Sequence, residues 1–186
     1  MDKKREQEQR MRTIIYDLDY ANGKCVDCGK SNMDYASINN GVIVCEKCAE
    51  EHRKLGNGIS FLRSFNEKWD DYLLKYIRAG GNSRFLFFAK SYHINKMDIN
   101  SKYKTKAAQY YRQIIRSEVM SYDPPDNIAL DDAKEVLDDI ENVYEEFENY
   151  SSVKHVNLDL LEKNVKKAEE SKGFFGGLWG KLTNSS

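Results

Sequence analysis

The 186-residue chain is predicted to adopt an α+β fold, in which a small central β-sheet of about three strands is surrounded by helices. Three observations lead to this prediction. All four cysteines fall into two Cys-x2-Cys pairs, which indicate a zinc site. Short β-prone runs lie between and just after these pairs, and segments with apolar residues at helical spacing flank them. Further helices are expected toward the C-terminus.

A helix is expected over residues 5–21, with Gly23 as its C-cap. Residues 35–38 and 42–44 are predicted strands, and Asn39-Asn40-Gly41 between them is typical of a hairpin turn. This hairpin would bring the second cysteine pair back beside the first.

A short helix is expected over residues 46–55, ended by Gly56, and residues 59–63 are the third predicted strand. Apolar residues at helical spacing predict the remaining helices of this part of the chain, at 68–79, 82–90 and 102–119.

The two cysteine pairs are Cys25-x2-Cys28 and Cys45-x2-Cys48, with sixteen residues between them. Zinc takes four thiolate or imidazole ligands in a tetrahedron, and pairs fifteen to twenty residues apart match its usual spacing. Two disulfides would need an oxidising compartment, and the charged residues 1–12 lack the apolar stretch of a signal peptide. A site with four cysteines is closed, so the one zinc ion is expected to be structural rather than catalytic.

Charge divides the chain into a basic and an acidic part. Residues 1–120 carry 22 lysines and arginines against 15 acidic residues, whereas residues 121–186 carry 7 against 15. Pro124-Pro125 marks the boundary. No segment approaches the roughly 18 apolar residues of a membrane span, so a soluble protein is expected. Because nothing at the N-terminus suggests export, the expected location is the cytoplasm. The predicted units are a zinc-finger domain at 5–122, an acidic amphipathic helical extension at 123–170 and a Gly/aromatic tail at 171–186.

The order and spacing of several motifs resemble the ArfGAP zinc-finger domain over roughly residues 5–120. They are Asn22-x2-Cys25-x-Asp27-Cys28-Gly29, Ala36-Ser37-x-Asn39-x-Gly41-x3-Cys45-x2-Cys48-x3-His52-Arg53-x-Leu55-Gly56, Ser60-x2-Arg63-Ser64, Trp69, Gly81-Asn82 and Tyr111-Arg112. The resemblance implies a zinc-pinned central sheet and stimulation of GTP hydrolysis by an Arf-family small GTPase in its GTP form.

Arg53 matches the position of that family's arginine finger. An arginine supplied in trans neutralises charge on the transferring phosphoryl group and is worth about 10³–10⁵ in rate. The chain would then be an activator, which lends Arg53 to its partner's active site and is not itself an enzyme. The alternative is a solvated helix residue that pairs with Glu50 or Glu51. Two positions depart from the family pattern: Tyr35 stands where tryptophan is usual, and Gly58 follows Leu55-Gly56-Asn57 where a histidine is usual.

Two other function classes remain open at this point. A scaffold of the same fold could bind GTPases or coat proteins without catalysis. A four-cysteine module could also bind nucleic acid, which requires a basic surface beside the metal. The helix after Cys45 carries Glu46, Glu50 and Glu51, and these carboxylates would repel phosphates. No nucleic acid is therefore expected among the partners.

Several other residues carry weaker signals. His52 is expected to be packed or hydrogen-bonded, because four cysteines already fill a zinc tetrahedron. Lys102, Lys104 and Lys106 either form an ordinary solvated segment or contact anionic lipid headgroups or an acidic GTPase surface. A structural or interface role is expected for Arg63, and structural roles for Trp69 and Asn82.

The acidic part carries apolar residues every three or four positions over 127–149, which predicts an amphipathic helix, and a second, shorter helix is expected from Leu158 to Ala168. The tail has apolar residues on one helical face among four glycines. Such a segment is typical of a helix that folds only in lipid packing defects, and it resembles the lipid-packing segments of some Golgi ArfGAPs. Recruitment to Golgi or vesicle membranes would follow; a disordered tail or a peptide docked on the protein's own core are the alternatives. The residues of this face are Phe174, Phe175, Leu178, Trp179 and Leu182.

Overall fold

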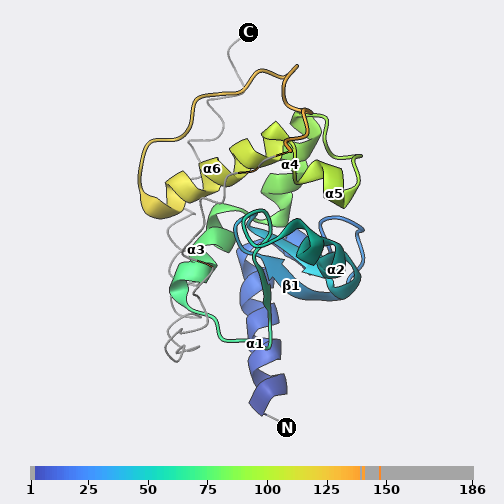
Figure 1. Cartoon of the computed structure of the whole chain (residues 1–186). Helices are drawn as coiled ribbons and strands as arrows, with labels where there is room; N and C mark the ends of the chain where they lie inside the picture. Colours follow the sequence, from blue (N-terminus) through green and yellow to red (C-terminus); the bar gives the residue numbers. More distant parts are fainter. Residues whose placement is uncertain (1–2, 139, 141–146, 148–186) are drawn as a thin grey trace.

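A three-stranded antiparallel sheet lies at the centre of the computed structural model, which describes residues 3–138, 140 and 147 (Figure 1). The strand order is β2-β1-β3, and the strands are β1 (Met33–Ser37), β2 (Val42–Cys45) and β3 (Leu62–Ser64). The three predicted strands are thus confirmed, but the third begins at Leu62 rather than at residue 59. Its expected first residues are held by the turn before it, because the Ile59 and Ser60 N–H groups donate to the Gly56 carbonyl at 3.1 and 2.8 Å.

The hairpin turn between β1 and β2 packs closely against another glycine-containing turn. The Gly41 N–H donates to the Ile38 carbonyl at 2.9 Å, and Gly41 has a φ of 61°, which glycine adopts without strain. The Gly81 N–H in turn donates to the Gly41 carbonyl at 2.7 Å. A Cβ atom at Gly80 would lie 2.6 Å from the Gly41 oxygen. The two turns can therefore meet only because Gly41 and Gly80 have no side chains.

The helix α2 (Glu46–Leu55) follows β2 directly and ends at Gly56, as predicted. The first predicted helix is shorter than expected: α1 (Lys3–Leu18) is followed by a separate 3-10 helix, η1 (Tyr20–Gly23). Asp19 separates them, because its carboxylate accepts hydrogen bonds from the Ala21 N–H at 3.0 Å and the Ser83 N–H at 2.8 Å. Gly23 therefore does not cap α1.

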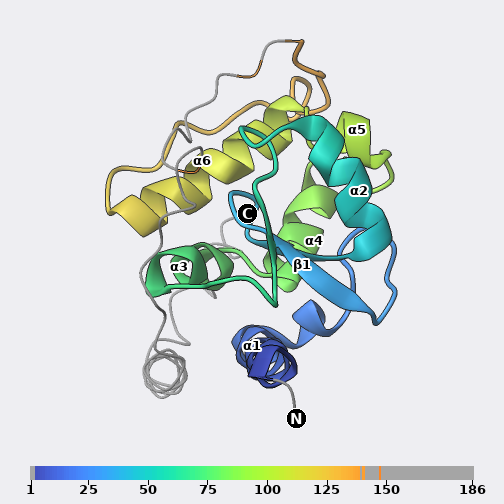
Figure 2. The same ribbon diagram turned by 60° about the horizontal axis from the view of Figure 1, so that its bottom comes forward.

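Three of the four helices described after α2 begin at a residue whose side chain caps them, and the other begins after Gly81. The four helices are α3 (Asp71–Ala79), α4 (Asn82–Ser91), the short α5 (Ile99–Lys102) and α6 (Lys106–Met120). The helix predicted from residue 102 starts later, because the Thr105 side chain accepts the Ala108 N–H at 3.1 Å and sets the first turn of α6. In Figure 2, α3 and α6 lie on one side of β1, and α2 and α5 on the other.

Trp69 and Asn82 have the structural roles that were predicted. Trp69 is buried and donates from its indole nitrogen to the Ser64 carbonyl at 2.9 Å. Asn82 is also buried; it accepts the Ile43 N–H at 2.8 Å and donates to the Lys24 carbonyl at 2.7 Å. The Asn82 amide thus ties the start of α4 to β2 and to the segment that carries the first cysteine pair.

Residues 121–138, called the strap below, run back along α6 to its first turn. The helix predicted over 127–149 is wrong for residues 127–138, which form turns and a single β-bridge to Thr105. The first N–H groups of a helix lack partners within that helix, and here strap carbonyls accept them. The bonds run from Lys106 to Glu135 and from Ala107 to Ala133, at 2.9 and 3.0 Å.

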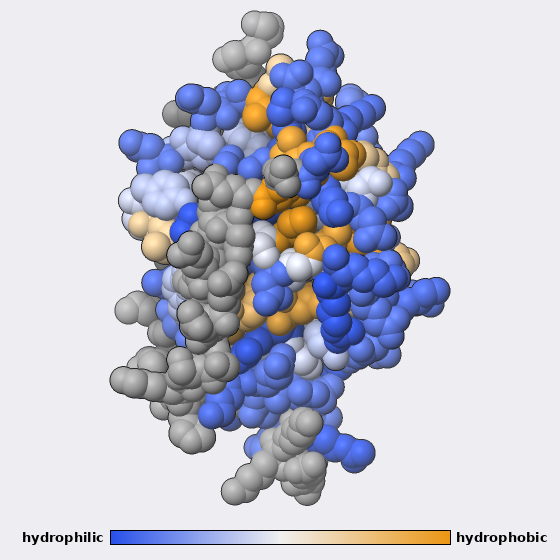
Figure 3. Space-filling view, viewed as in Figure 1, coloured by the Kyte–Doolittle hydropathy of each residue, from blue (hydrophilic) through white to orange (hydrophobic). Residues whose placement is uncertain are grey.

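Phe147 extends the core beyond the strap. Its ring is buried and stacks on Phe61, with 4.6 Å between the ring centroids, and it meets Tyr76 edge to face at 5.4 Å. The shorter helix predicted at 158–168 and the apolar face of the tail lie outside the described residues. Within those residues, no helix has the length and apolarity that crossing a bilayer requires. The surface seen in Figure 3 is largely hydrophilic, with apolar residues gathered along the middle of that face.

Candidate functional site

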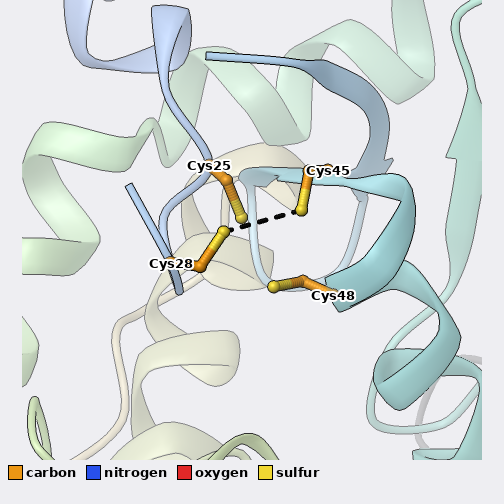
Figure 4. Close-up of side chains that lie close together, drawn as sticks. All are labelled: Cys25, Cys28, Cys45 and Cys48. Carbon is orange, nitrogen blue, oxygen red and sulfur yellow. Dashed lines mark hydrogen bonds between the residues drawn. The ribbon is translucent and has the colours of Figure 1, made fainter. Parts of the chain in front are cut away.

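The four predicted zinc ligands come together at one end of the sheet (Figure 4). Cys25 and Cys28 lie in the turn before β1, Cys45 ends β2, and Cys48 is in the first turn of α2. Their sulfur atoms all lie within 4.8 Å of one another, and the Cys28 and Cys45 sulfurs are 3.6 Å apart. With Zn–S bonds of about 2.3 Å, a tetrahedron places its sulfurs about 3.8 Å apart. The four cysteines are therefore positioned to bind one zinc ion.

Backbone hydrogen bonds shape the turn that carries the first cysteine pair. The Cys25 N–H donates to the Lys30 carbonyl at 2.7 Å, and the Gly29 N–H donates to the Cys25 carbonyl at 2.9 Å. Burial raises the pKa of the Cys25 thiol to about 11. A thiolate at this position is thus stable at neutral pH only beside a cation, and Zn²⁺ supplies that charge when it binds.

His52 lies next to the cysteine cluster but is held by other partners. Its ring is fully buried, with Nδ1 2.8 Å from the Ser60 hydroxyl and Nε2 2.9 Å from the Asp27 carboxylate. Both ring nitrogens are therefore occupied by hydrogen bonds. This agrees with the prediction of a packed, hydrogen-bonded residue rather than a metal ligand.

Asp27 joins the first cysteine turn to two helices. Besides His52, it accepts the Lys102 ammonium at 2.9 Å and the Tyr103 hydroxyl at 3.2 Å. The side chains of Asp27 and Lys102 are 2% and 7% exposed. Burial by itself would raise the pKa of Asp27, but the His52 hydrogen bond and the Lys102 charge outweigh it and lower that pKa. The network links the metal centre to α2 and α5.

Both roles expected for Lys102, a solvated residue or a contact with lipid or a GTPase surface, are wrong, because this side chain is the buried partner of Asp27. Lys106 pairs with Glu135 of the strap at 2.5 Å. One signal for this network is visible in the sequence: Asp27 lies between the two cysteines of the first pair, too close to the metal to be solvated freely. Its cationic partner, 75 positions later, follows no periodic pattern.

Arg53 lies in the last turn of α2, and its side chain is 47% exposed. One guanidinium nitrogen is 3.5 Å from the Glu46 carboxylate, and the guanidinium carbon is 4.9 Å from the centre of the Tyr35 ring. Seven residues make about two helical turns, so positions 46 and 53 share a face. The ion pair therefore forms with Glu46 rather than with Glu50 or Glu51, the partners considered above.

Arg63 and Gly58 each take part in a hydrogen bond that holds a turn of the domain. The Arg63 guanidinium donates to the Lys68 carbonyl at 2.9 Å, which fixes the turn after β3. The Gly58 carbonyl accepts the Asn39 side-chain amide at 3.2 Å. Gly58 also lines a cavity of about 300 Å³ between the end of α2 and the strap, together with Leu55 and Leu137.

Comparison with known proteins gives one consistent result. The family model ArfGap, described as "Putative GTPase activating protein for Arf", matches residues 8–120. ADP-ribosylation factor GTPase-activating protein 3 of Macaca fascicularis is 39% identical over 98 residues, which are 52% of this chain and 19% of that protein. The mouse protein of the same name shows the same identity and coverage. The chain thus spans about a fifth of the length of these curated relatives.

A human protein, "Arf-GAP with Rho-GAP domain, ANK repeat and PH domain-containing protein 3", is 40% identical over 67 residues, 34% of this chain and 4% of its own. Among solved structures, a "putative GTPase activating protein for ADP ribosylation factor" from Cryptosporidium parvum matches with a TM-score of 0.53 and 27% identity. That match covers 61% of this chain and 92% of the other. The matched family model, the four-cysteine centre and the shared fold agree, and the chain belongs to the ArfGap family.

Proposed function

We propose that this protein stimulates GTP hydrolysis by an Arf-family small GTPase in its GTP form, with Arg53 supplied to the partner's active site. The observation that carries the proposal is the exposed Arg53 guanidinium on a helix whose first turn belongs to the cysteine cluster. The relatives described as activators of ADP-ribosylation factor GTPases support the same assignment.

The surroundings of α2 suit the presentation of a finger residue. Cys45 and Cys48 would tie the start of this helix to zinc, and the buried His52, next to Arg53 in the chain, ties its end to Asp27 and Ser60. A catalytic side chain must be held close to its productive geometry by its supporting residues. Both ends of α2 are therefore fixed while Arg53 itself remains exposed.

The chemistry belongs to the GTPase. As the γ-phosphoryl group is transferred to water, charge spreads over its oxygens and onto the leaving phosphate. A guanidinium keeps its charge and offers several donors in a fixed fork, so it can bind two of these oxygens at once. A lysine at the same position would offer a point charge, which fits this geometry less well.

The test is GTP hydrolysis by GTP-loaded Arf-family proteins with the wild-type chain, with Arg53→Lys and with Arg5→Lys. Arg5 is exposed on α1, so its conversion is a matched control. We expect strong stimulation by the wild type and the control, and a loss of about 10³-fold or more with Arg53→Lys while binding persists. Binding without stimulation by the wild type would indicate a scaffold, and no binding to any Arf-family member would overturn the proposal.

DNA binding is the competing function for a four-cysteine module. The exposed carboxylates of Glu46 and Glu50 on α2 disfavour it, because they would face the phosphates. A salt-dependent mobility-shift assay with duplex DNA separates the two functions: tight binding would favour the nucleic-acid module.

We also infer recruitment to Golgi or vesicle membranes, where coat proteins would be further partners. This rests on the sequence of the tail, whose apolar face contains Phe175 and Trp179. Flotation with small and large liposomes tests it. We expect the wild type to bind small, highly curved vesicles, and Trp179→Ser to weaken this binding. Equal flotation of the wild type and the Trp179→Ser variant would contradict the inference.

A further inference from the structure

We propose that Glu46 is a restraining counter-charge for Arg53, which holds the guanidinium on the surface of α2 until the phosphates of a docked GTPase displace it. The inference rests on the proposed function, because it concerns the same arginine. It assigns to Glu46 a positioning role and makes the Glu46–Arg53 pair a step that must break before Arg53 can act.

The contacts of Arg53 define a resting position for its guanidinium. The carboxylate of Glu46, which is about two turns earlier on the same face of α2, lies 3.5 Å from a guanidinium nitrogen. The Tyr35 ring of β1 faces the guanidinium, with its centre 4.9 Å from the guanidinium carbon. A cation over an aromatic face is attracted to the ring at such a distance. The guanidinium therefore lies between a carboxylate and a ring, directed along α2.

The other two carboxylates of α2 do not share this role. Glu51 pairs with Lys54 at 2.7 Å and accepts the Asn100 amide at 3.4 Å. Glu50 is exposed, and within the described part of the chain no ion pair is found for it. The charge of Glu46 is thus the one that acts on Arg53, and Glu50 offers a control of equal charge on the same helix.

The strength of this pair suits a restraint that can be released. Both side chains are about half exposed, at 47% for Arg53 and 56% for Glu46, so water and salt screen their attraction. Exposed pairs of this kind shift an equilibrium by about two- to fivefold. A phosphoryl group in a GTPase active site carries more than one negative charge away from bulk water, so it competes successfully with one exposed carboxylate.

The experiment compares Glu46→Gln with Glu50→Gln, which remove the same charge from neighbouring turns of α2. Stimulated hydrolysis is measured as kcat/KM for the GTP-loaded partner at low and at physiological salt. We expect Glu46→Gln to raise kcat/KM by about two- to fivefold over wild type at low salt, and Glu50→Gln to stay near wild type. The gain should shrink as salt rises, because the wild-type pair is then weaker.

A second comparison shows whether the effect acts through the arginine. In an Arg53→Ala background, Glu46→Gln should give no gain, because no guanidinium is left to release. A gain that persists without Arg53, equal gains from both glutamine variants, or a loss of activity with Glu46→Gln would each overturn the proposal. Zinc content and thermal unfolding of each variant exclude damage to the neighbouring metal centre.

The restraining role of Glu46 and the finger role of Arg53 can be refuted separately. If the wild type fails to stimulate, or Arg53→Lys stays fully active, the finger assignment itself is wrong. If stimulation depends on Arg53 but Glu46→Gln matches Glu50→Gln, only the restraining role of Glu46 is refuted.

Discussion

Replacing Asp27 by asparagine removes the negative charge from a site where the cationic partner cannot reach water. The side chains of Asp27 and Lys102 are 2% and 7% exposed, and their charged groups lie 2.9 Å apart. Removal of one partner from a buried ion pair costs about 3–5 kcal/mol, because the remaining charge is left without compensation. We expect Asp27→Asn to lower the free energy of unfolding by this amount. Such a loss would consume a large part of the stability of an ordinary domain.

Urea unfolding of the zinc-loaded protein at pH 7 measures this loss, with Asp17→Asn, an exposed change on α1, as the control. Because the cost comes from the stranded charge, adding Lys102→Met to Asp27→Asn should recover part of it. A loss below about 1 kcal/mol, or a double variant with the full sum of both losses, would refute the explanation.

Two further changes test the metal centre and the extended core. Chelation should release one zinc ion per chain and lower the free energy of unfolding by more than about 4 kcal/mol, because metal binding contributes to folding. Metal analysis measures the release, and thermal unfolding before and after zinc is restored measures the loss of stability. An unchanged melting temperature would contradict the prediction. Phe147→Ala should cost about 3–5 kcal/mol, because its buried ring stacks on Phe61. Phe87→Ala, at a side chain that is 70% exposed, is the control, and similar losses from both changes would argue against the packing of Phe147.

The elements that sequence predicted best are those fixed by local chemistry. The four cysteines had the spacing that one metal requires, and α2 begins beside Cys45 and ends at Gly56, whose φ is 82°. The starts of β3 and α6 were missed although nearby residues set them, and the end of α1 was missed because it depends on a distant partner. Asp19 ends α1 because the start of α4 offers it the Ser83 N–H, 64 residues later.

The strap shows why periodicity alone was misleading. Ala133, Val136, Leu137 and Ile140 recur at helical spacing, yet Ala133 is fully buried while Val136 is 45% exposed. The first turn of α6 needs acceptors for its N–H groups, and carbonyls that enter a helix of their own could not supply them. The burial of Lys102 was also not predicted, because alternating lysines usually indicate a solvated segment.

The strap also bears on how the protein is made. The family match stops at residue 120, but the side chain of Phe147 still belongs to the core. As a chain grows from its N-terminus, the face of Phe61 and the first N–H groups of α6 stay uncovered until residues 133–147 have left the ribosome. A nascent chain that already contains every cysteine and Arg53 is therefore still an unfinished fold.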